Sequence, residues 1–229
     1  MLDWIYPPVC ASCGEPGYRV CESCRAKIKF IRGEGCLICG GPISKGNSIC
    51  NECRLRPPNY SAVRSLAVYE GVVRDCIHAL KYDNNRGLGE YFAELLGKLF
   101  AKTDWQVDFI MPVPLSSKRL AKRGYNQAAC IAKPLASYLG IPYHPFGIQH
   151  LRDTPSQVGL SAEARRQNVK EAFAAIPEIV VEKRVLVVDD VMTTGATLEA
   201  CAAVLRAAGA SVVYGLTLAR SGDHALNID

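Results

Sequence analysis

The sequence has no run of eighteen consecutive apolar residues, the minimum length of a membrane-spanning helix. Its start, Met-Leu-Asp-Trp-Ile-Tyr-Pro-Pro, offers neither a basic stretch nor an apolar segment long enough for a secretory signal. Histidine is scarce: the four histidines stand singly, so no Ser/His/Asp or Cys/His catalytic arrangement can be argued. We therefore expect a cytoplasmic protein with no membrane span and no histidine-based nucleophilic chemistry.

A strong charge bias is also missing. Residues 1–60 carry eight Lys and Arg against five Asp and Glu, and residues 61–229 carry nineteen against seventeen. This balance excludes a dedicated nucleic-acid coat protein, so any anion site must arise where cations cluster locally. With 49% apolar and 21% charged residues, the 229-residue chain has the composition of a folded globular protein.

The first 53 residues are poor in aliphatic side chains, with only eleven Leu, Ile, Val or Phe, too few for a hydrophobic core. Eight of the eleven cysteines lie here in Cys-x-x-Cys pairs: Cys10/Cys13, Cys21/Cys24, Cys36/Cys39 and Cys50/Cys53. Two such pairs form a closed four-thiolate site, the pattern of a structural zinc ribbon. We predict a double zinc ribbon over residues 1–56 that holds two structural Zn²⁺ ions.

Two questions about these cysteines stay open at this point. Sequential pairing of the Cys-x-x-Cys motifs closes the shorter loops, and interleaved pairing is the alternative. An iron–sulfur cluster is the alternative metal group, since it also takes four thiolates. A redox Cys-x-x-Cys occurs once, beside a βαβ unit, so four copies argue against that chemistry. The other cysteines, Cys76, Cys130 and Cys201, fall within apolar helical patterns and are expected in the core.

Residues 60–229 alternate apolar strands with amphipathic helices. The patterns predict strands over residues 62–69, 109–113, 184–188 and 211–218, and helices over residues 72–81, 89–101, 127–139, 161–170 and 197–208. Such alternation implies crossover connections. We therefore predict an α/β domain with a mainly parallel sheet and helices on both faces.

The most informative stretch is Val-Leu-Val-Val-Asp-Asp-Val-Met-Thr-Thr-Gly-Ala-Thr at residues 185–197. A buried strand delivers Asp189 and Asp190 at its carboxyl end, where open α/β sheets bind ligands. The small-residue loop behind them opens a helix, and its backbone N–H groups and hydroxyls form a nest for a phosphate. A capped strand–turn–helix with an incidental acid pair is the alternative interpretation.

This stretch resembles the phosphoribosyl pyrophosphate (PRPP) binding motif of type I phosphoribosyltransferases. The resemblance implies that Asp189 and Asp190, the candidate catalytic residues, hold the ribose hydroxyls. It also implies a type I phosphoribosyltransferase fold, Mg²⁺ bound chiefly through PRPP's own oxygens, and a pyrophosphate loop at residues 115–119. The implied PRPP-binding residues are Asp189, Asp190, Val191, Met192, Thr193, Thr194, Gly195, Ala196 and Thr197.

A basic cluster follows the strand at residues 109–113. We interpret it as a flexible loop that suits pyrophosphate or a nucleic-acid backbone, with a base stacked on Tyr125. A solvated charged face is the alternative. The candidate residues are Ser116, Ser117, Lys118, Arg119, Lys122, Arg123 and Tyr125. For residues 151–160, followed by Arg165 and Arg166, the resemblance to phosphoribosyltransferases suggests a mobile loop that closes over the reacting centre, and an ordinary surface segment is the alternative.

Taken in order, the motifs resemble the ComF family of bacterial competence proteins over essentially the whole chain. They are Pro-Pro-x-Cys-x-x-Cys-Gly, Ala-Leu-Lys-Tyr at residues 79–82, Pro-Val-Pro at residues 112–114, the basic cluster, residues 154–168 and the PRPP motif. The resemblance implies a role in DNA uptake and transformation, with single-stranded DNA and DNA-uptake or recombination proteins as partners. A true phosphoribosyltransferase with a metabolic acceptor is the alternative, and the sequence names neither the acceptor nor an acceptor-selecting residue.

Overall fold

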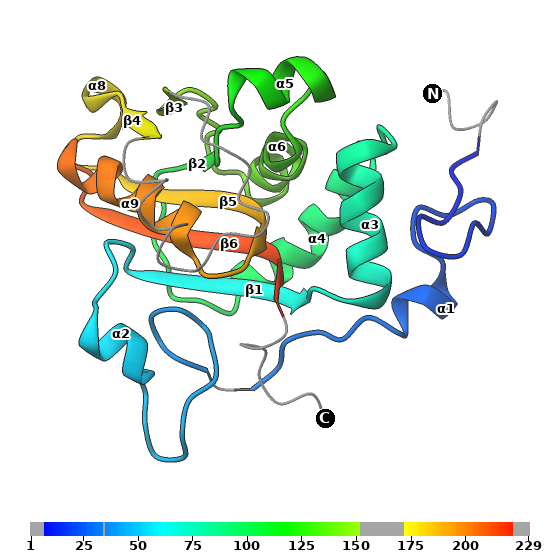
Figure 1. The fold of residues 1–229 in the computed structure, drawn as a ribbon, viewed down its shortest axis with the longest axis horizontal. Helices are drawn as coiled ribbons and strands as arrows, with labels where there is room; N and C mark the ends of the chain where they lie inside the picture. The colour runs from blue at the N-terminus through cyan, green and yellow to red at the C-terminus, as the bar shows by residue number, and fades with distance from the viewer. Residues whose placement is uncertain (1–6, 34, 152–171, 222–229) are drawn as a thin grey trace.

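A computed structural model describes residues 7–33, 35–151 and 172–221 (Figure 1). Its centre is a four-stranded sheet in the order β1-β6-β5-β2, in which every neighbouring pair is parallel. The strands are β1 (Ala62–Val68), β2 (Phe109–Pro112), β5 (Arg184–Met192) and β6 (Val212–Arg220). Parallel strands place their carboxyl ends at one edge, so residues following β2 and β5 meet there.

Helices cover both faces of this sheet, as Figure 1 shows. Three of them, α3 (Gly71–Tyr82), α4 (Leu88–Phe100) and α6 (Gln127–Leu139), pack on one face, and α9 (Ala196–Ala207) packs on the other. Alternate side chains of β5 divide between the two layers: Leu186 and Val188 join the α3–α4–α6 layer, and Val185 and Val187 join the α9 layer. The continuous apolar run in β5 follows from burial on both faces.

The cysteine-rich segment contains two short helices, α1 (Glu22–Arg25) and α2 (Asn51–Leu55). Its two halves do not form a core of their own. Residues 10–28 pack into the core beside α3, where the hydroxyl of Ser12 donates to Asp75 at 2.8 Å. Residues 36–53 pack into the core on the α9 side, beside Val63 of β1. Each half is therefore supported by a different layer.

The predicted parallel α/β architecture is confirmed, and all four predicted strands and four of the five predicted helices are present. The predicted flexible loop at the basic cluster was wrong, because the structure has helix α5 (Ser117–Arg123) there. Besides α5, five short elements were not predicted: α1, α2, β3 (Ile148–His150), β4 (Phe173–Ala175) and α8 (Pro177–Val180). Apart from Leu151, the predicted loop at residues 151–160 lies outside the described residues, as do the predicted helix at residues 161–170 and with it Arg165 and Arg166.

Within the part of the chain that the structure describes, none of the helices combines the length and the apolar character needed to cross a bilayer. The predicted core positions of the remaining cysteines are confirmed. Cys76 and Cys201 are fully buried, and Cys130 is partly buried against the α3–α4–α6 layer. The division into domains at residues 1–56 and 60–229 stays a prediction.

Candidate phosphoribosyl site and zinc centres

The loop predicted to bind phosphate joins the carboxyl end of β5 to the first turn of α9. A hollow lies here, lined by Asp189 and by residues 191–198. The loop carries the hydroxyls of Thr193 and Thr194, and α9 is twelve residues long. The positive end of its helix dipole therefore faces the hollow, as expected for a phosphate site.

Gly195 sets the shape of this loop. Its φ of +78° lies in the left-handed region, and a Cβ at this position would meet the Met192 methyl group at 2.7 Å. The Thr194 hydroxyl accepts a hydrogen bond from the N–H of Ala196 at 3.4 Å. Glycine thus lets the chain turn sharply from strand to helix without a clash beneath the nest.

The two aspartates are both buried, but they lie in different layers. Asp189 lines the hollow, and its Oδ1 accepts the backbone N–H of Asp190 at 2.8 Å. The Asp190 carboxylate faces the α3–α6 layer, where it pairs with the ammonium of Lys81. The amide of Gln127 donates to its other oxygen at 3.2 Å. The adjacent acids therefore share one strand and one edge but have different partners.

These surroundings drive the pKa values of the two acids apart. Burial and the neighbouring Asp190 carboxylate raise the pKa of Asp189 well above its usual range. Burial also opposes ionisation of Asp190, but the Lys81 ammonium outweighs it and lowers the pKa of Asp190. The fold thus favours the neutral form of Asp189 and the ionised form of Asp190.

The candidate pyrophosphate segment begins at the same sheet edge. Pro112 at the end of β2 pairs with Val188, and the N–H of Val113 donates to the Val188 carbonyl at 2.8 Å. Ser116 is buried and caps α5 by accepting from the N–H of Arg119 at 3.4 Å. Gly124 ends the helix in the left-handed region.

Helix α5 presents most of the predicted basic cluster to solvent. Ser117, Lys118, Arg119 and Lys122 are exposed. Arg123 is half-buried and turns inward, where it donates to the side-chain oxygen of Gln127. The structure thus brings Arg123 into contact with a residue that holds Asp190, while the other cations lie on the outer surface of α5.

The expectation that Tyr125 stacks a base does not agree with the structure. Its side chain is only 8% exposed, its hydroxyl donates to the Leu80 carbonyl, and the Arg86 guanidinium lies 4.4 Å from its ring centre. Because α3 and Arg86 cover the ring, Tyr125 is a packing residue. The aromatic ring that is exposed nearby is Tyr82, at 64%, with Arg123 lying 5.4 Å from its centre.

Sequence reasoning missed Lys81 and Gln127 as members of this site. Lys81 stands in the last turn of α3, and Gln127 in the first turn of α6. Lys81 belongs to the Ala-Leu-Lys-Tyr segment that contributed to the family resemblance, and as the charged residue in an otherwise apolar segment it could have been recognised as a site residue.

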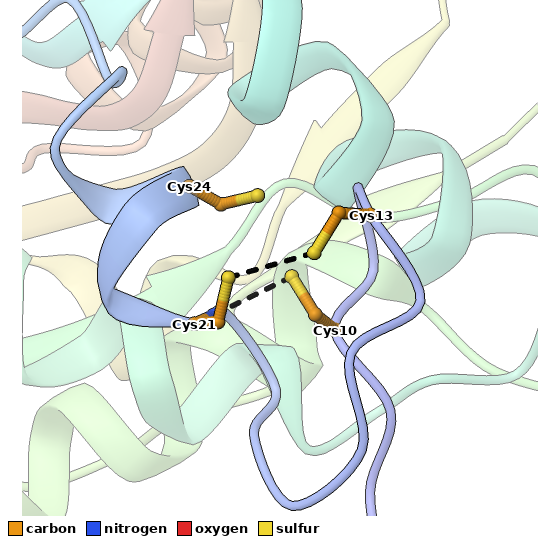
Figure 2. A group of neighbouring side chains, drawn as sticks. All are labelled: Cys10, Cys13, Cys21 and Cys24. Atoms are coloured by element: carbon orange, nitrogen blue, oxygen red, sulfur yellow. Dashed lines mark hydrogen bonds between the residues drawn. The ribbon is translucent and has the colours of Figure 1, made fainter.

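The cysteines form two compact four-thiol clusters. The first comprises Cys10, Cys13, Cys21 and Cys24, and the second comprises Cys36, Cys39, Cys50 and Cys53. Within each, all four Sγ atoms lie within 4.8 Å of one another, which confirms sequential pairing. Figure 2 shows the four side chains of the first cluster converging on one point.

The spacing of the sulfur atoms fits a tetrahedral metal. A Zn–S bond of about 2.3 Å puts neighbouring sulfurs about 3.8 Å apart. The Sγ atoms of Cys13 and Cys21 are 3.5 Å apart, and those of Cys39 and Cys50 are 3.8 Å apart. The clusters therefore suit zinc, and with four protein thiolates each they leave no ligand position for water, as in structural sites.

Backbone N–H groups point at the sulfurs and favour thiolates. The N–H of Cys21 donates to Cys10 Sγ at 3.4 Å, and that of Cys50 donates to Cys36 Sγ at 3.3 Å. Burial opposes ionisation, yet these and neighbouring backbone bonds lower the pKa of Cys10 to about 6 and that of Cys36 to about 7. Each cluster thus holds a thiol that is ready to ionise and bind metal.

The second cluster lies directly behind the phosphate loop. Arg220, at the end of β6, is 5% exposed; its guanidinium donates to the Cys39 carbonyl and lies 3.5 Å from the sulfur of Met192. From the segment between the clusters and β1, Asn59 donates twice to the Glu199 carboxylate in the first turn of α9, at 2.9 and 2.6 Å. The loop is therefore braced from the cysteine-rich side.

Comparisons with known proteins agree with this arrangement. Residues 1–54 match the model of a double zinc ribbon domain, and residues 79–229 match that of a phosphoribosyl transferase domain. The DNA utilization protein YhgH of Salmonella typhimurium is 32% identical over 94% of this chain and 98% of its own length. Competence protein F of Haemophilus influenzae is 32% identical over 88% of this chain and 90% of its own. Competence protein ComFC of Bacillus subtilis is 28% identical over 90% of this chain and 86% of its own. The chain therefore belongs to the phosphoribosyltransferase family, among the members that carry a double zinc ribbon ahead of the transferase domain.

Proposed function

We propose that the chain binds PRPP at the carboxyl edge of its sheet. The observation that carries this proposal is the hollow lined by Asp189 and residues 191–198, where buried carboxylate and phosphate nest adjoin. In the proposed complex, residues 193–197 hold the 5-phosphate through backbone N–H groups and hydroxyls, and the acid pair accepts the ribose hydroxyls. A ribose 5-phosphate derivative carries both a phosphate and vicinal hydroxyls, the two groups that this nest and these acids would bind.

Mg²⁺ would accompany PRPP. Among the residues that the structure describes, only the two cysteine clusters bring three or more potential metal ligands together. The protein thus offers Mg²⁺ little beyond Asp189 and Asp190, whose carboxylates suit a hard cation. This agrees with an ion held chiefly by the oxygens of PRPP itself.

Calorimetric titration with PRPP in magnesium buffer tests the proposal. The double substitution Asp189→Asn with Asp190→Asn keeps side-chain size but removes charge-assisted bonds worth roughly 1.5–3 kcal/mol each. We therefore expect PRPP affinity to fall by at least about 100-fold. Asp104→Asn, at an exposed position outside the site, is the control and should bind as the wild type does. Equal affinities for wild type and the double variant would mean that the hollow takes another ligand.

The biological setting that we propose is DNA uptake, with the protein handling incoming single-stranded DNA in the cytoplasm. Support comes from the names of the relatives, which are a DNA utilization protein and competence proteins. The exposed cations of α5 are the surface that we assign to the DNA backbone. They adjoin the phosphoribosyl site because α5 follows β2 at the same sheet edge.

A second candidate is a phosphoribosyltransferase reaction, favoured by the intact acid pair and phosphate loop. An acceptor nitrogen would form a bond to C1 of PRPP and lose its proton, while the C1–O bond breaks and pyrophosphate leaves with the electron pair. Pyrophosphate release from PRPP, measured with and without single-stranded DNA and free bases, separates the candidates. Tight PRPP binding without release would identify a binding module.

A further inference from the structure

Lys81 of α3 extends the phosphoribosyl site on the side away from the phosphate loop. Its ammonium pairs with Asp190, whose side chain is 6% exposed, while the Lys81 side chain is 22% exposed. The pair therefore sits at the boundary between core and solvent. A lysine ammonium has three donors, so it can keep Asp190 and still offer donors toward the solvent side.

A second cation, Arg123, is linked to the same carboxylate through the side chain of Gln127. Arg123 donates to the Gln127 carbonyl oxygen, and the Gln127 amide donates to Asp190 at 3.2 Å. Burial and the adjacent carboxylate raise the pKa of Asp189, whereas Lys81 lowers the pKa of Asp190 in spite of its burial. Lys81 contacts this carboxylate directly and Arg123 reaches it through Gln127, so two cations gather at this edge of the sheet, which suits an anionic ligand group.

PRPP carries its anionic groups at opposite ends, a 5-phosphate on one side of the ribose and a pyrophosphate on C1. The nest at residues 193–197 leads into α9, which packs on one face of the sheet, whereas Lys81 of α3 and Gln127 of α6 belong to the helices on the other face. With the 5-phosphate in the nest and the ribose at the acid pair, the far end of the ligand is directed toward the α3–α6 layer.

We propose that Lys81 is a pyrophosphate-binding residue. Its ammonium pairs with Asp190 before the ligand binds and donates to pyrophosphate oxygens afterwards, which leaves Asp190 free to accept from a ribose hydroxyl. This inference rests on the proposed PRPP site and adds the residue that recognises the pyrophosphate end. It also gives a reason for burying the Lys81–Asp190 ion pair, since two apolar side chains at these positions would not have to lose their hydration.

The test compares Lys81→Met with the wild type in titrations with PRPP, ribose 5-phosphate and inorganic pyrophosphate. We expect Lys81→Met to lower affinity for PRPP and for pyrophosphate by about ten- to 100-fold, and affinity for ribose 5-phosphate much less. Lys81→Arg should recover part of the PRPP affinity. Lys98→Met, which removes an ion-paired lysine from the exposed surface of α4, is the matched control and should change nothing.

The possible failures are distinguishable. A wild-type protein that binds no PRPP overturns the proposed function and this inference together. A wild type that binds PRPP, with Lys81→Met losing PRPP and ribose 5-phosphate affinity equally or neither, overturns the role of Lys81 alone. Should the variant melt below assay temperature, amine labelling of the wild type decides: pyrophosphate should protect Lys81, whereas ribose 5-phosphate should not. Equal protection by both ligands, or by neither, would refute the assignment.

Discussion

Neutralising the two aspartates one at a time should change the stability of the ligand-free protein in opposite directions. Asp189→Asn and Asp190→Asn preserve side-chain shape, so each variant tests charge. Burial beside a second carboxylate raises the pKa of Asp189, whereas Lys81 lowers the pKa of Asp190 in spite of its burial. The fold therefore disfavours a charge on the first acid and depends on a charge on the second.

Asp190→Asn leaves the Lys81 ammonium without its partner. Removing one member of a buried ion pair costs about 3–5 kcal/mol. Because the Lys81 side chain is 22% exposed, water compensates for part of this loss. We expect a destabilisation on the order of 3 kcal/mol. For a chain of this size, that lowers the melting temperature by about 6–12 °C.

Asp189→Asn should stabilise the protein, and the gain should grow with pH. The pKa of Asp189 is higher in the folded protein than in the unfolded chain, where it is about 3.9. Its contribution to wild-type stability is therefore present at low pH and is lost as pH rises through the folded-state value. Asparagine binds no proton and escapes this loss, so the difference increases by up to about 1.4 kcal/mol per pH unit in that window.

Calorimetric melts of the wild type and both variants between about pH 5 and 8 measure these effects, with Asp104→Asn as an exposed control. If the Asp190→Asn variant has the same melting temperature as the wild type, the ion pair with Lys81 contributes nothing to stability. An Asp189→Asn gain that is constant across pH would show that Asp189 is ionised throughout, and the charge assignment of the site would fail.

Two further predictions concern the metal and DNA. Elemental analysis should find two zinc ions per chain, and chelation should unfold the cysteine-rich segment, since a structural zinc supplies on the order of 10–16 kcal/mol; one zinc, or iron-dependent visible absorbance, would contradict the two clusters. Arg119→Ala with Lys122→Ala removes two exposed cations one helical turn apart on α5, and should flatten the slope of log DNA affinity against log salt by up to about 1.4. An unchanged slope would mean that these side chains are a solvated face and would leave the DNA proposal resting on the relatives alone.

Hydrophobic periodicity was enough to predict the main strands and helices of residues 60–229, but not where each strand ends. The prediction ended the strand at Val188 because two acids follow, yet β5 runs on to Met192. Its pairing with β6 explains the extension, since Asp189 opposes Thr217 and Val191 opposes Ala219. Ladder hydrogen bonds to a neighbouring strand outweigh the poor strand propensity of aspartate, and propensity alone cannot show this.

At the basic cluster, the sequence analysis predicted a flexible loop where the structure has helix α5. Four cations in six residues indicate a solvated loop, but Ser116 before them and Gly124 after them are ordinary helix-capping residues. Greater weight on those two positions would have predicted α5 from sequence. The burial of Tyr125 could not be foreseen in this way, because it depends on the carbonyl of Leu80 in a distant helix.

The two cysteine clusters contact the elements that form the phosphoribosyl site. A ribbon joined only by a linker would leave the phosphoribosyl site independent of metal. Here the first cluster packs against α3, whose last turn carries Lys81, and Ser12 donates to Asp75 on that helix. The second cluster contacts Arg220, which lies against Met192 beneath the phosphate loop. Because the two clusters support opposite layers of the site, we expect zinc binding to stabilise both the helix that carries Lys81 and the loop that follows β5.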